Sequence, residues 1–532
     1  MLTKAHNKKL LLLFMLTLGA LYYVTQKETN KRAALLNVEA PTTALECPAL
    51  ITTQDSKPFK GDKNKGFESL TQTTSLQQLS IQGTIPSWLK GMLIATGPAQ
   101  FELGPTKAAY WFNGLALLHG FYFDGNSISY QNSFLDSVYY QRCMKNGRFD
   151  SSMSTEKPKG FFSRLASAAL GTPEPYDNGN LAIALINNKV VALTETTLGV
   201  QIDPRTLKTI RPFNLNDHLE GHLTTINFLY DTDDQSYYNY LINFGTTSNY
   251  VVYKIGSDSV AKPLSTTSVK TPSYMRSMAM TKNYIIITEI PYVVNPMDLL
   301  LGAGAFIEKV QWKPELGTNF IIIDKKSGAT LKTLHSATPF LVFTTINAFE
   351  QNNELVIDCI VYNDASVIPF TKIDALRSIN EHEFEPSYYT RMNLNLTTAS
   401  VTSKQLCSTT FACPTFNKKY AMNPYSFAYG TGSSAPHLFP HKIVKINTQT
   451  EATLEWQENG CYANEPIFVA APNGITEDDG VLLSCVFDSK TLRSLLLILD
   501  ATTLKEIGRA YLPTTVPLGI AGTFISDETM KA

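Results

Sequence analysis

Short apolar runs separated by turn residues dominate the chain from about Leu79 onward. Many of the residues in these runs are β-branched or aromatic, and the runs have the length and bounding residues typical of β-strands. The clearest predicted strands are Val190–Leu198, Tyr237–Phe244, Tyr250–Ile255, Tyr284–Val294, Asn319–Asp324, Leu355–Tyr362, Gly480–Phe487 and Leu495–Asp500. Few segments have a helical period, and the best amphipathic candidate is 161–170. The pattern predicts an all-β protein.

One type of hairpin recurs along these strands. In each copy a strand ends in Asp or Asn, a tight turn follows, and Thr-Leu with a charged residue opens the next strand. The four turn residues are Asp203, Asp324, Asn447 and Asp500. Asp and Asn suit such corners because their side chains accept hydrogen bonds from turn amides. Recurrence of one hairpin favours the blades of a β-propeller, and unrelated hairpins with shared turn chemistry are the alternative.

The N-terminus carries a membrane-targeting pattern. Lys8 and Lys9 precede the apolar run Leu10–Val24, and Lys27 follows it. The run is short for a full span, so residues 1–25 are interpreted as an uncleaved membrane anchor or as a cleaved signal peptide. Residues 26–78 are polar and predict a tether, and residues 79–527 form the predicted propeller. Either interpretation predicts a membrane-associated protein or one secreted into a lumen or extracytoplasmic space.

Composition and charge limit the kinds of partner and site that we expect. The chain has 532 residues, 44% of them hydrophobic, and a formal net charge of −1, so we expect no nucleic acid partner. The seven cysteines are scattered without a CxxC pair, which favours isolated thiols, with a local Cys407–Cys413 disulfide as the alternative. No nucleophile elbow, His-Glu-x-x-His or phosphate loop is present in the sequence.

Several motifs, taken together and in order, resemble the carotenoid cleavage oxygenases over Gly83 to Phe524. They are Gly83–Gly91, Trp111–Gly114, Pro272–Met275, Ile346–Glu350, Glu465–Val469 and Glu477–Gly480. The most similar branch includes the retinal pigment epithelium isomerohydrolase and the β-carotene oxygenases. The resemblance implies a seven-bladed β-propeller with a loop-built cap over the axis, an apolar tunnel and one Fe²⁺ held by four histidines. Its members cleave a polyene double bond with dioxygen, or isomerise and hydrolyse a retinyl ester.

Other residues stand where the resemblance implies the iron-binding histidines. They are Thr225 (or Asn227, depending on which flanking motif is counted from), Arg276, Thr344 and Ala521. Hydroxyl, amide and methyl groups are poor substitutes for imidazole, and a guanidinium is a permanent cation that repels a metal. We therefore predict that the chain takes no cofactor and has no metal site.

Two glutamates match family positions that orient the ligand histidines, Glu195 and Glu465. The resemblance places Glu195 opposite Arg276. A buried carboxylate without a partner is costly, whereas Arg and Glu form a strong pair. We predict a salt bridge between these two residues on the axis, with a solvated Glu195 in a central channel as the alternative.

Two apolar segments correspond to places where related proteins contact a bilayer. The predicted membrane-contact residues are Phe161, Phe162, Leu165, Leu299, Leu300 and Leu301. Lysines flank both segments, as is typical of interfacial anchors. Loops packed on the propeller are the alternative.

The functional prediction is a degenerate, non-catalytic relative of the carotenoid oxygenases that binds a polyene, retinoid or other lipid. One alternative is an active iron-dependent carotenoid dioxygenase or retinoid isomerase with relocated ligands, for which His218 and His222 are the nearest candidates. The other is a membrane-tethered propeller that serves as an interaction platform without a small ligand.

Overall fold

The computed structural model describes residues 61–150, 176–214, 219, 221–301, 306–378, 386–435 and 438–531. All of them belong to one compact unit, Thr52–Ala532. The predicted anchor or signal segment 1–25 and the predicted helix 161–170 lie outside the described residues. Within the described ranges, no helix is both long enough and apolar enough to cross a membrane.

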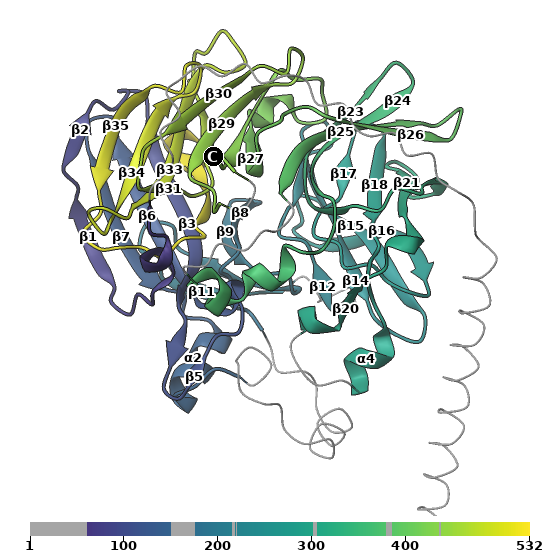
Figure 1. The fold of residues 1–532 in the computed structure, drawn as a ribbon, viewed down its shortest axis with the longest axis horizontal. Coiled ribbons are helices and arrows are strands. Elements are labelled where there is room, and N and C mark those ends of the chain that lie inside the picture. The colour runs from purple at the N-terminus through teal and green to yellow at the C-terminus, as the bar shows by residue number, and fades with distance from the viewer. Residues whose placement is uncertain are drawn as a thin grey trace, which may run out of the picture. The chain divides into compact units, whose positions relative to one another are not determined.

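Seven antiparallel sheets of four to six strands contain most of the strands in the described residues. This arrangement confirms the expected all-β, seven-bladed propeller. Figure 1 shows the sheets in chain order, from purple at the N-terminal side through teal to yellow. Strands at one end of each sheet contact their counterparts in neighbouring sheets, as β17 does with β23, β23 with β27, and β32 with β36. These strands are the inner strands of the propeller.

The strands of the first four blades are given from the inner edge outward. Blade one has β36 (Ala521–Ser526), β3 (Lys90–Gln100), β6 (Leu115–Asp124), β7 (Ile128–Phe134) and β1 (Thr74–Gln78). Blade two has β8 (Ala182–Ile186), β9 (Lys189–Leu193), β10 (Leu198–Ile202) and β11 (Thr209–Asn214). Blade three has β12 (Leu223–Thr224), β14 (Ser236–Asn243), β15 (Ser248–Ile255) and β16 (Ala261–Val269), with β13 (Leu229–Asp231) on β14. Blade four has β17 (Ala279–Met280), β18 (Tyr284–Glu289), β21 (Thr318–Asp324) and β22 (Thr330–Ser336).

The last three blades follow the same plan. Blade five has β23 (Leu341–Gln351), β24 (Glu354–Tyr362), β25 (Ser387–Asn395) and β26 (Ser400–Gln405). Blade six has β27 (Ala412–Phe416), β28 (Phe427–Gly432), β29 (Lys442–Asn447) and β30 (Thr453–Gln457). Blade seven has β31 (Cys461–Ala463) and β32 (Ile467–Ala470) on β33 (Gly480–Asp488), then β34 (Arg493–Asp500), β35 (Glu506–Tyr511) and β2 (Ile81–Gly83).

Short elements complete the described structure. Two two-stranded sheets pair β4 (Glu102–Leu103) with β5 (Thr106–Lys107) and β19 (Tyr292–Val294) with β20 (Val310–Trp312). The α-helices are α2 (Val138–Asn146), α4 (Pro296–Leu301), α5 (Ile373–Leu376) and α6 (Asp527–Lys531). The 3₁₀ turns are Asn64–Phe67, Trp111–Asn113, Phe306–Lys309, Pro314–Leu316, Ile368–Thr371 and Lys418–Tyr420.

Two strand pairings close the ring between the ends of the described chain. The C-terminal strand β36 pairs with β3, so it completes blade one. The early strand β2 pairs with β35, so it completes blade seven. In Figure 1 the purple strand β2 accordingly lies beside the yellow strand β35. Each terminal blade therefore contains strands from both ends of the sequence.

The repeated hairpin of the sequence is present between the third and fourth strands of its blades. Asp203 Oδ1 accepts hydrogen bonds from two turn amides, and Asn447 Oδ1 does the same. Asp324 and Asp500 cap their turns in the same way, through the amides three residues later. The predicted role of these side chains is confirmed.

One predicted strand is wrong. The run Val190–Leu198 is interrupted, since β9 ends at Leu193 and β10 begins at Leu198. These two strands are antiparallel neighbours, so the residues between them form a hairpin loop. The Thr196 hydroxyl holds this loop by donating to the Tyr176 carbonyl oxygen at 2.7 Å. The loop contains Glu195, and alternation of apolar residues alone did not reveal it.

Cysteines contribute no disulfide to the described residues. All six of their thiols are free, including those of Cys407 and Cys413, so the alternative of a local disulfide is wrong.

Apolar clusters between neighbouring blades stabilise the ring. One of them joins Ile94 of blade one to Ile183 and Val200 of blade two.

A buried charge network joins blades five and six. The fully buried carboxylate of Asp358 on β24 accepts hydrogen bonds from Arg391 Nε and Nη2, both at 2.8 Å. It also accepts from the hydroxyls of Tyr389, at 2.8 Å, and Tyr425, at 2.7 Å. Tyr425 lies just before β28, so one carboxylate connects the two blades.

We expect Asp358→Ala to lower the free energy of unfolding by about 3–5 kcal/mol, because it leaves the Arg391 guanidinium without its counter-charge. Urea denaturation of the full chain measures this loss. The control is Asp374→Ala, whose carboxylate pairs with Lys107 at the surface with 66% of its side chain exposed, and whose loss should stay below about 1 kcal/mol. Equal small losses for both variants would contradict the structural role of the network.

Candidate functional site

A cavity of about 1200 Å³ lies at the centre of the ring. Its wall includes residues of all seven blades, among them β8, β13, β17, β23, β27, β32 and β36. Much of the wall is apolar or aromatic, as at Trp111, Phe112, Met278, Ile307 and Phe343. Polar and charged side chains lie among them, as at Asn227, Thr344, Thr415 and Glu465. Such a cavity fits a largely apolar molecule with a polar feature.

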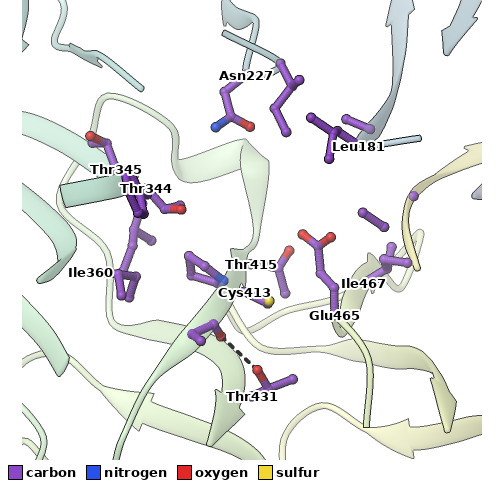
Figure 2. Close-up of a pocket in the computed structure, with 18 of the residues that line it drawn as sticks. Leu181, Asn227, Thr344, Thr345, Ile360, Cys413, Thr415, Thr431, Glu465 and Ile467 are labelled. Carbon is purple, nitrogen blue, oxygen red and sulfur yellow. Dashed lines mark hydrogen bonds between the residues drawn. The ribbon is translucent and has the colours of Figure 1, made fainter. Parts of the chain in front are cut away.

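Most of the residues expected at the site meet in this cavity. Asn227, Arg276, Thr344 and Ala521 all line it. Figure 2 shows Asn227 and Thr344 around the same space. Thr225, the alternative to Asn227, is only 1% exposed, and its hydroxyl accepts the Asn227 amide hydrogen at 2.9 Å. Of these two candidates, Asn227 is therefore the one whose side chain lines the cavity.

The predicted salt bridge between Arg276 and Glu195 is present. Arg276 follows Tyr274 in the segment that leads into β17, and its Nε donates to Glu195 Oε1. The Tyr274 hydroxyl donates to the other carboxylate oxygen, Oε2, at 2.5 Å. The guanidinium carbon lies 5.3 Å from the centre of the Phe343 ring, in range of a cation–π contact. Burial alone would lower the pKa of Arg276, but Glu195 raises it above its usual range, so the side chain stays charged.

Glu465 lies across the cavity wall, between β31 and β32. Figure 2 shows its carboxylate directed into the cavity, near Thr415 and Cys413. Among the described residues it has no hydrogen bond or ion pair. Burial raises the pKa of Glu465 to about 7, and nearby Lys418 partly offsets this shift. Desolvation by the surrounding protein lowers the pKa of Lys418 to about 8, although this side chain is exposed, against the opposing effect of Glu465. Both groups therefore change charge near neutral pH.

Sequence reasoning did not identify Cys413 or Lys418 as cavity residues. Both line the cavity, Cys413 from β27 and Lys418 from the 3₁₀ turn that follows it. Desolvation by the surrounding protein, and then the charge of Glu465, raises the pKa of the Cys413 thiol to about 12, although the side chain is exposed, so the thiol stays protonated. The resemblance also implies a third orienting glutamate just before Pro414, where this chain has Ala412 and Cys413, and that motif was the available signal for Cys413. Nothing in the local sequence marks Lys418.

The side chains at the four matched positions do not fit an iron site of four imidazoles. They offer an amide, a guanidinium, a hydroxyl and a methyl group, and the guanidinium is tied to Glu195. Across the residues that the structure describes, no three His, Cys, Asp or Glu side chains gather as a metal ion requires. His222 is exposed and its Nδ1 accepts the Phe244 amide hydrogen, while His218 lies outside the described residues.

The ring of seven blades around a central ligand cavity defines the class of protein, and comparison with known proteins identifies its family. The family model RPE65, retinal pigment epithelial membrane protein, matches residues 67–526. The chain therefore belongs to the RPE65 and carotenoid cleavage oxygenase family. It is 29% identical to β,β-carotene 15,15′-dioxygenase of Gallus gallus, over 85% of this chain and 96% of the relative. It is 27% identical to the mitochondrial carotenoid-cleaving dioxygenase of Mustela putorius furo, over 90% of this chain and 98% of the relative.

Solved structures agree on the fold. Cobalt-substituted apocarotenoid oxygenase of Synechocystis superposes with a TM-score of 0.79 at 23% identity, over 87% of this chain and 98% of that one. A chimera of apocarotenoid oxygenase and RPE65 superposes with a TM-score of 0.78 at 22% identity, over the same shares of the two chains.

The prediction that the chain takes no cofactor is wrong. The family to which the chain belongs consists of iron-dependent carotenoid oxygenases, and the Synechocystis relative holds cobalt as a substitute metal. Other side chains at the four positions where the resemblance implies histidines do not establish that a metal is absent. A metal held by this chain would need ligands other than the four-imidazole set.

The predicted membrane contacts are only partly visible. Leu299 belongs to α4 and is half-buried against the core, and the α4 backbone continues through Leu300 and Leu301. Phe161, Phe162 and Leu165 lie outside the described residues. Membrane association stays a prediction.

We expect Arg276→Ala to lower the free energy of unfolding by about 3–5 kcal/mol, because Glu195 is left charged inside the protein. The matched control is the double variant Arg276→Gln with Glu195→Gln, which removes both charges and should cost much less. Urea denaturation compares the three proteins. A loss below about 1 kcal/mol for Arg276→Ala, the scale of an exposed pair, would contradict a structural role for the salt bridge.

The raised pKa of Glu465 gives a pH-dependent stability. The folded protein holds the proton up to about pH 7, whereas an unfolded glutamate loses it near 4.5, so stability should fall as pH rises between these values. Glu465→Gln is neutral throughout and should remove this slope. We expect the variant to match the wild type at pH 4.5 and to exceed it at pH 8 by about 1–3 kcal/mol. Urea denaturation at both pH values, with the exposed Glu68→Gln as control, tests this; identical slopes in all three proteins would refute it.

Proposed function

We propose that this chain binds an extended apolar molecule, a polyene, retinoid or other lipid, in its central cavity, and that it does not cleave this ligand by the four-histidine chemistry of its relatives. The observation that carries the proposal is the Arg276–Glu195 salt bridge in the cavity wall, at a position matched to an iron-binding histidine. A permanent cation there opposes a second cation at the same place.

The size and surface of the cavity support the binding part of the proposal. Typical small-molecule pockets have volumes of about 300–1,000 Å³, so a cavity of about 1200 Å³ has room for a long ligand. Trp111, Phe112 and Phe343 provide flat aromatic surfaces against which a polyene can pack. The named relatives are dioxygenases of carotenoids, which are long apolar polyenes.

A catalytic function is the competing candidate. The relatives named above are dioxygenases and match this chain over most of its length. A catalytic member would need an arrangement of ligands different from the four matched positions. The two candidates differ in what happens to a bound polyene, so one assay separates them.

The purified chain is incubated with β-carotene in detergent micelles, with Fe²⁺, ascorbate and oxygen supplied. We expect the polyene absorption spectrum to shift on binding while the chromophore persists, and we expect no aldehyde product above the protein-free rate. Arg276→His should not start cleavage, because three further histidines are still missing. Aldehyde production by the wild type would establish the catalytic candidate instead.

A cavity-filling variant tests where the polyene binds. Ala521 faces the cavity, so Ala521→Phe should weaken binding by about tenfold or more through steric overlap. The control is Ile475→Phe at a side chain that is 94% exposed outside the cavity, and it should leave binding unchanged. If the wild type shows no polyene binding at all, the interaction platform becomes the better description.

A further inference from the structure

The guanidinium of Arg276 has hydrogen-bond donors left over after its salt bridge. An arginine carries five N–H donors. Glu195 takes the Nε–H, and among the described residues no acceptor contacts Nη1 or Nη2. The side chain lines the cavity with 29% of its surface exposed, and Phe343 lies against it. Two adjacent donor groups of a charged side chain are therefore available at a cavity whose wall is mostly apolar.

A carboxylate is the ligand group that best satisfies two such donors. Its two oxygens match the spacing of adjacent guanidinium N–H groups, and hydrogen bonds between opposite charges are stronger than neutral ones. A hydroxyl or carbonyl end group offers one oxygen and no charge. An apolar molecule with a carboxylate at one end would thus fill both parts of the cavity, the apolar wall and the Arg276 donors.

The charged and titratable groups around Arg276 determine how strongly an anion is attracted. Glu195, Tyr240, Tyr274, Tyr362 and Cys413 interact with Arg276 directly. Glu465 interacts with Cys413 and Lys418, and Lys63, Lys90 and Lys419 also line the cavity. The charge of Arg276 acts on both the Tyr362 hydroxyl and the Cys413 thiol, and Glu465 also acts on that thiol. These groups therefore share one part of the cavity.

Two of these groups make that part pH-sensitive. The pKa values are about 7 for Glu465 and about 8 for Lys418, so at pH 6 Glu465 is neutral and Lys418 is charged. At pH 9 Glu465 is charged and Lys418 is neutral, so the sum of their charges is two units lower than at pH 6. An anion should therefore bind better at pH 6 than at pH 9, provided that its own carboxyl group is ionised at both.

We propose that the cavity binds a long-chain or polyene carboxylic acid whose carboxylate accepts hydrogen bonds from Nη1 and Nη2 of Arg276. This inference rests on the proposed function, since it specifies the ligand of the same cavity. It assigns Arg276 a second role beside its salt bridge, namely selection among apolar molecules by their end group.

The test compares two fluorescent probes that differ only at the end group, cis-parinaric acid and its methyl ester, titrated into the full-length wild type at pH 7. The carboxylate gains charge-assisted hydrogen bonds that the ester cannot match, so the acid should bind about 10- to 100-fold more tightly. Arg276→Gln together with Glu195→Gln removes the positive charge and the paired guanidinium donors without leaving an unpaired charge. In this variant the preference for the acid should disappear, while ester binding should stay within about threefold of wild type.

The matched control is Arg211→Gln, an exposed arginine on β11 outside the cavity, which should keep the preference for the acid. Circular dichroism spectra of all variants verify their folding, and Arg276→Lys serves as a second variant if the double variant does not fold. Because lysine keeps the charge but loses the paired donors, it should retain only part of the preference.

Each outcome decides a different point. Equal binding of acid and ester by the wild type, with no effect of the Arg276 variants, overturns the carboxylate inference and leaves the proposed apolar-ligand function intact. A preference that survives in the double variant also overturns it. Binding of neither probe overturns the proposed function and this inference together. A preference for the acid that is larger at pH 6 than at pH 9, and depends less on pH in Glu465→Gln, in which only Lys418 still titrates, supports the carboxylate inference.

Discussion

The pairing of β36 with β3 and of β2 with β35 closes the ring, and the site depends on this closure. In a closed propeller the inner strands of all blades face one axis, so residues far apart in the chain become neighbours. Glu195 lies in the hairpin loop of blade two, whereas Glu465 lies between β31 and β32 of blade seven, and both reach one cavity. An open or incomplete ring would leave the inner edges of the terminal blades without partners.

The charge of Arg276 governs the chemistry of the cavity. A buried guanidinium requires a counter-charge, and Glu195 supplies it with Tyr274 holding the second carboxylate oxygen. Glu465 has no comparable partner among the described residues, so it keeps its proton to about pH 7. Of these two glutamates, only Glu195 therefore has an ionic partner among the described residues. This difference follows from one arginine that reaches the first carboxylate and not the second.

The chain belongs to a family of iron-dependent oxygenases, but its cavity does not contain a site of four imidazoles. The family model matches residues 67–526, and the fold is shared with solved relatives. The positions where the resemblance implies ligand histidines carry groups with other bonding properties. Selection on a fold acts mainly through core packing and turns, whereas selection on chemistry acts through a few side chains, so the two can separate.

The sequence by itself determined the all-β architecture, since apolar alternation and the Asp or Asn turns are local properties of consecutive residues. Motifs near Arg276 and Glu195 also predicted their salt bridge, because the resemblance supplied the facing positions. Local pattern could not decide between Thr225 and Asn227, or reveal the loop at Glu195, because a residue's exposure depends on strands elsewhere in the chain. Only the tertiary structure brought Lys418 and Cys413 beside Glu465. It alone decided the protonation of that carboxyl group, because burial and neighbouring charge come from residues distant in sequence.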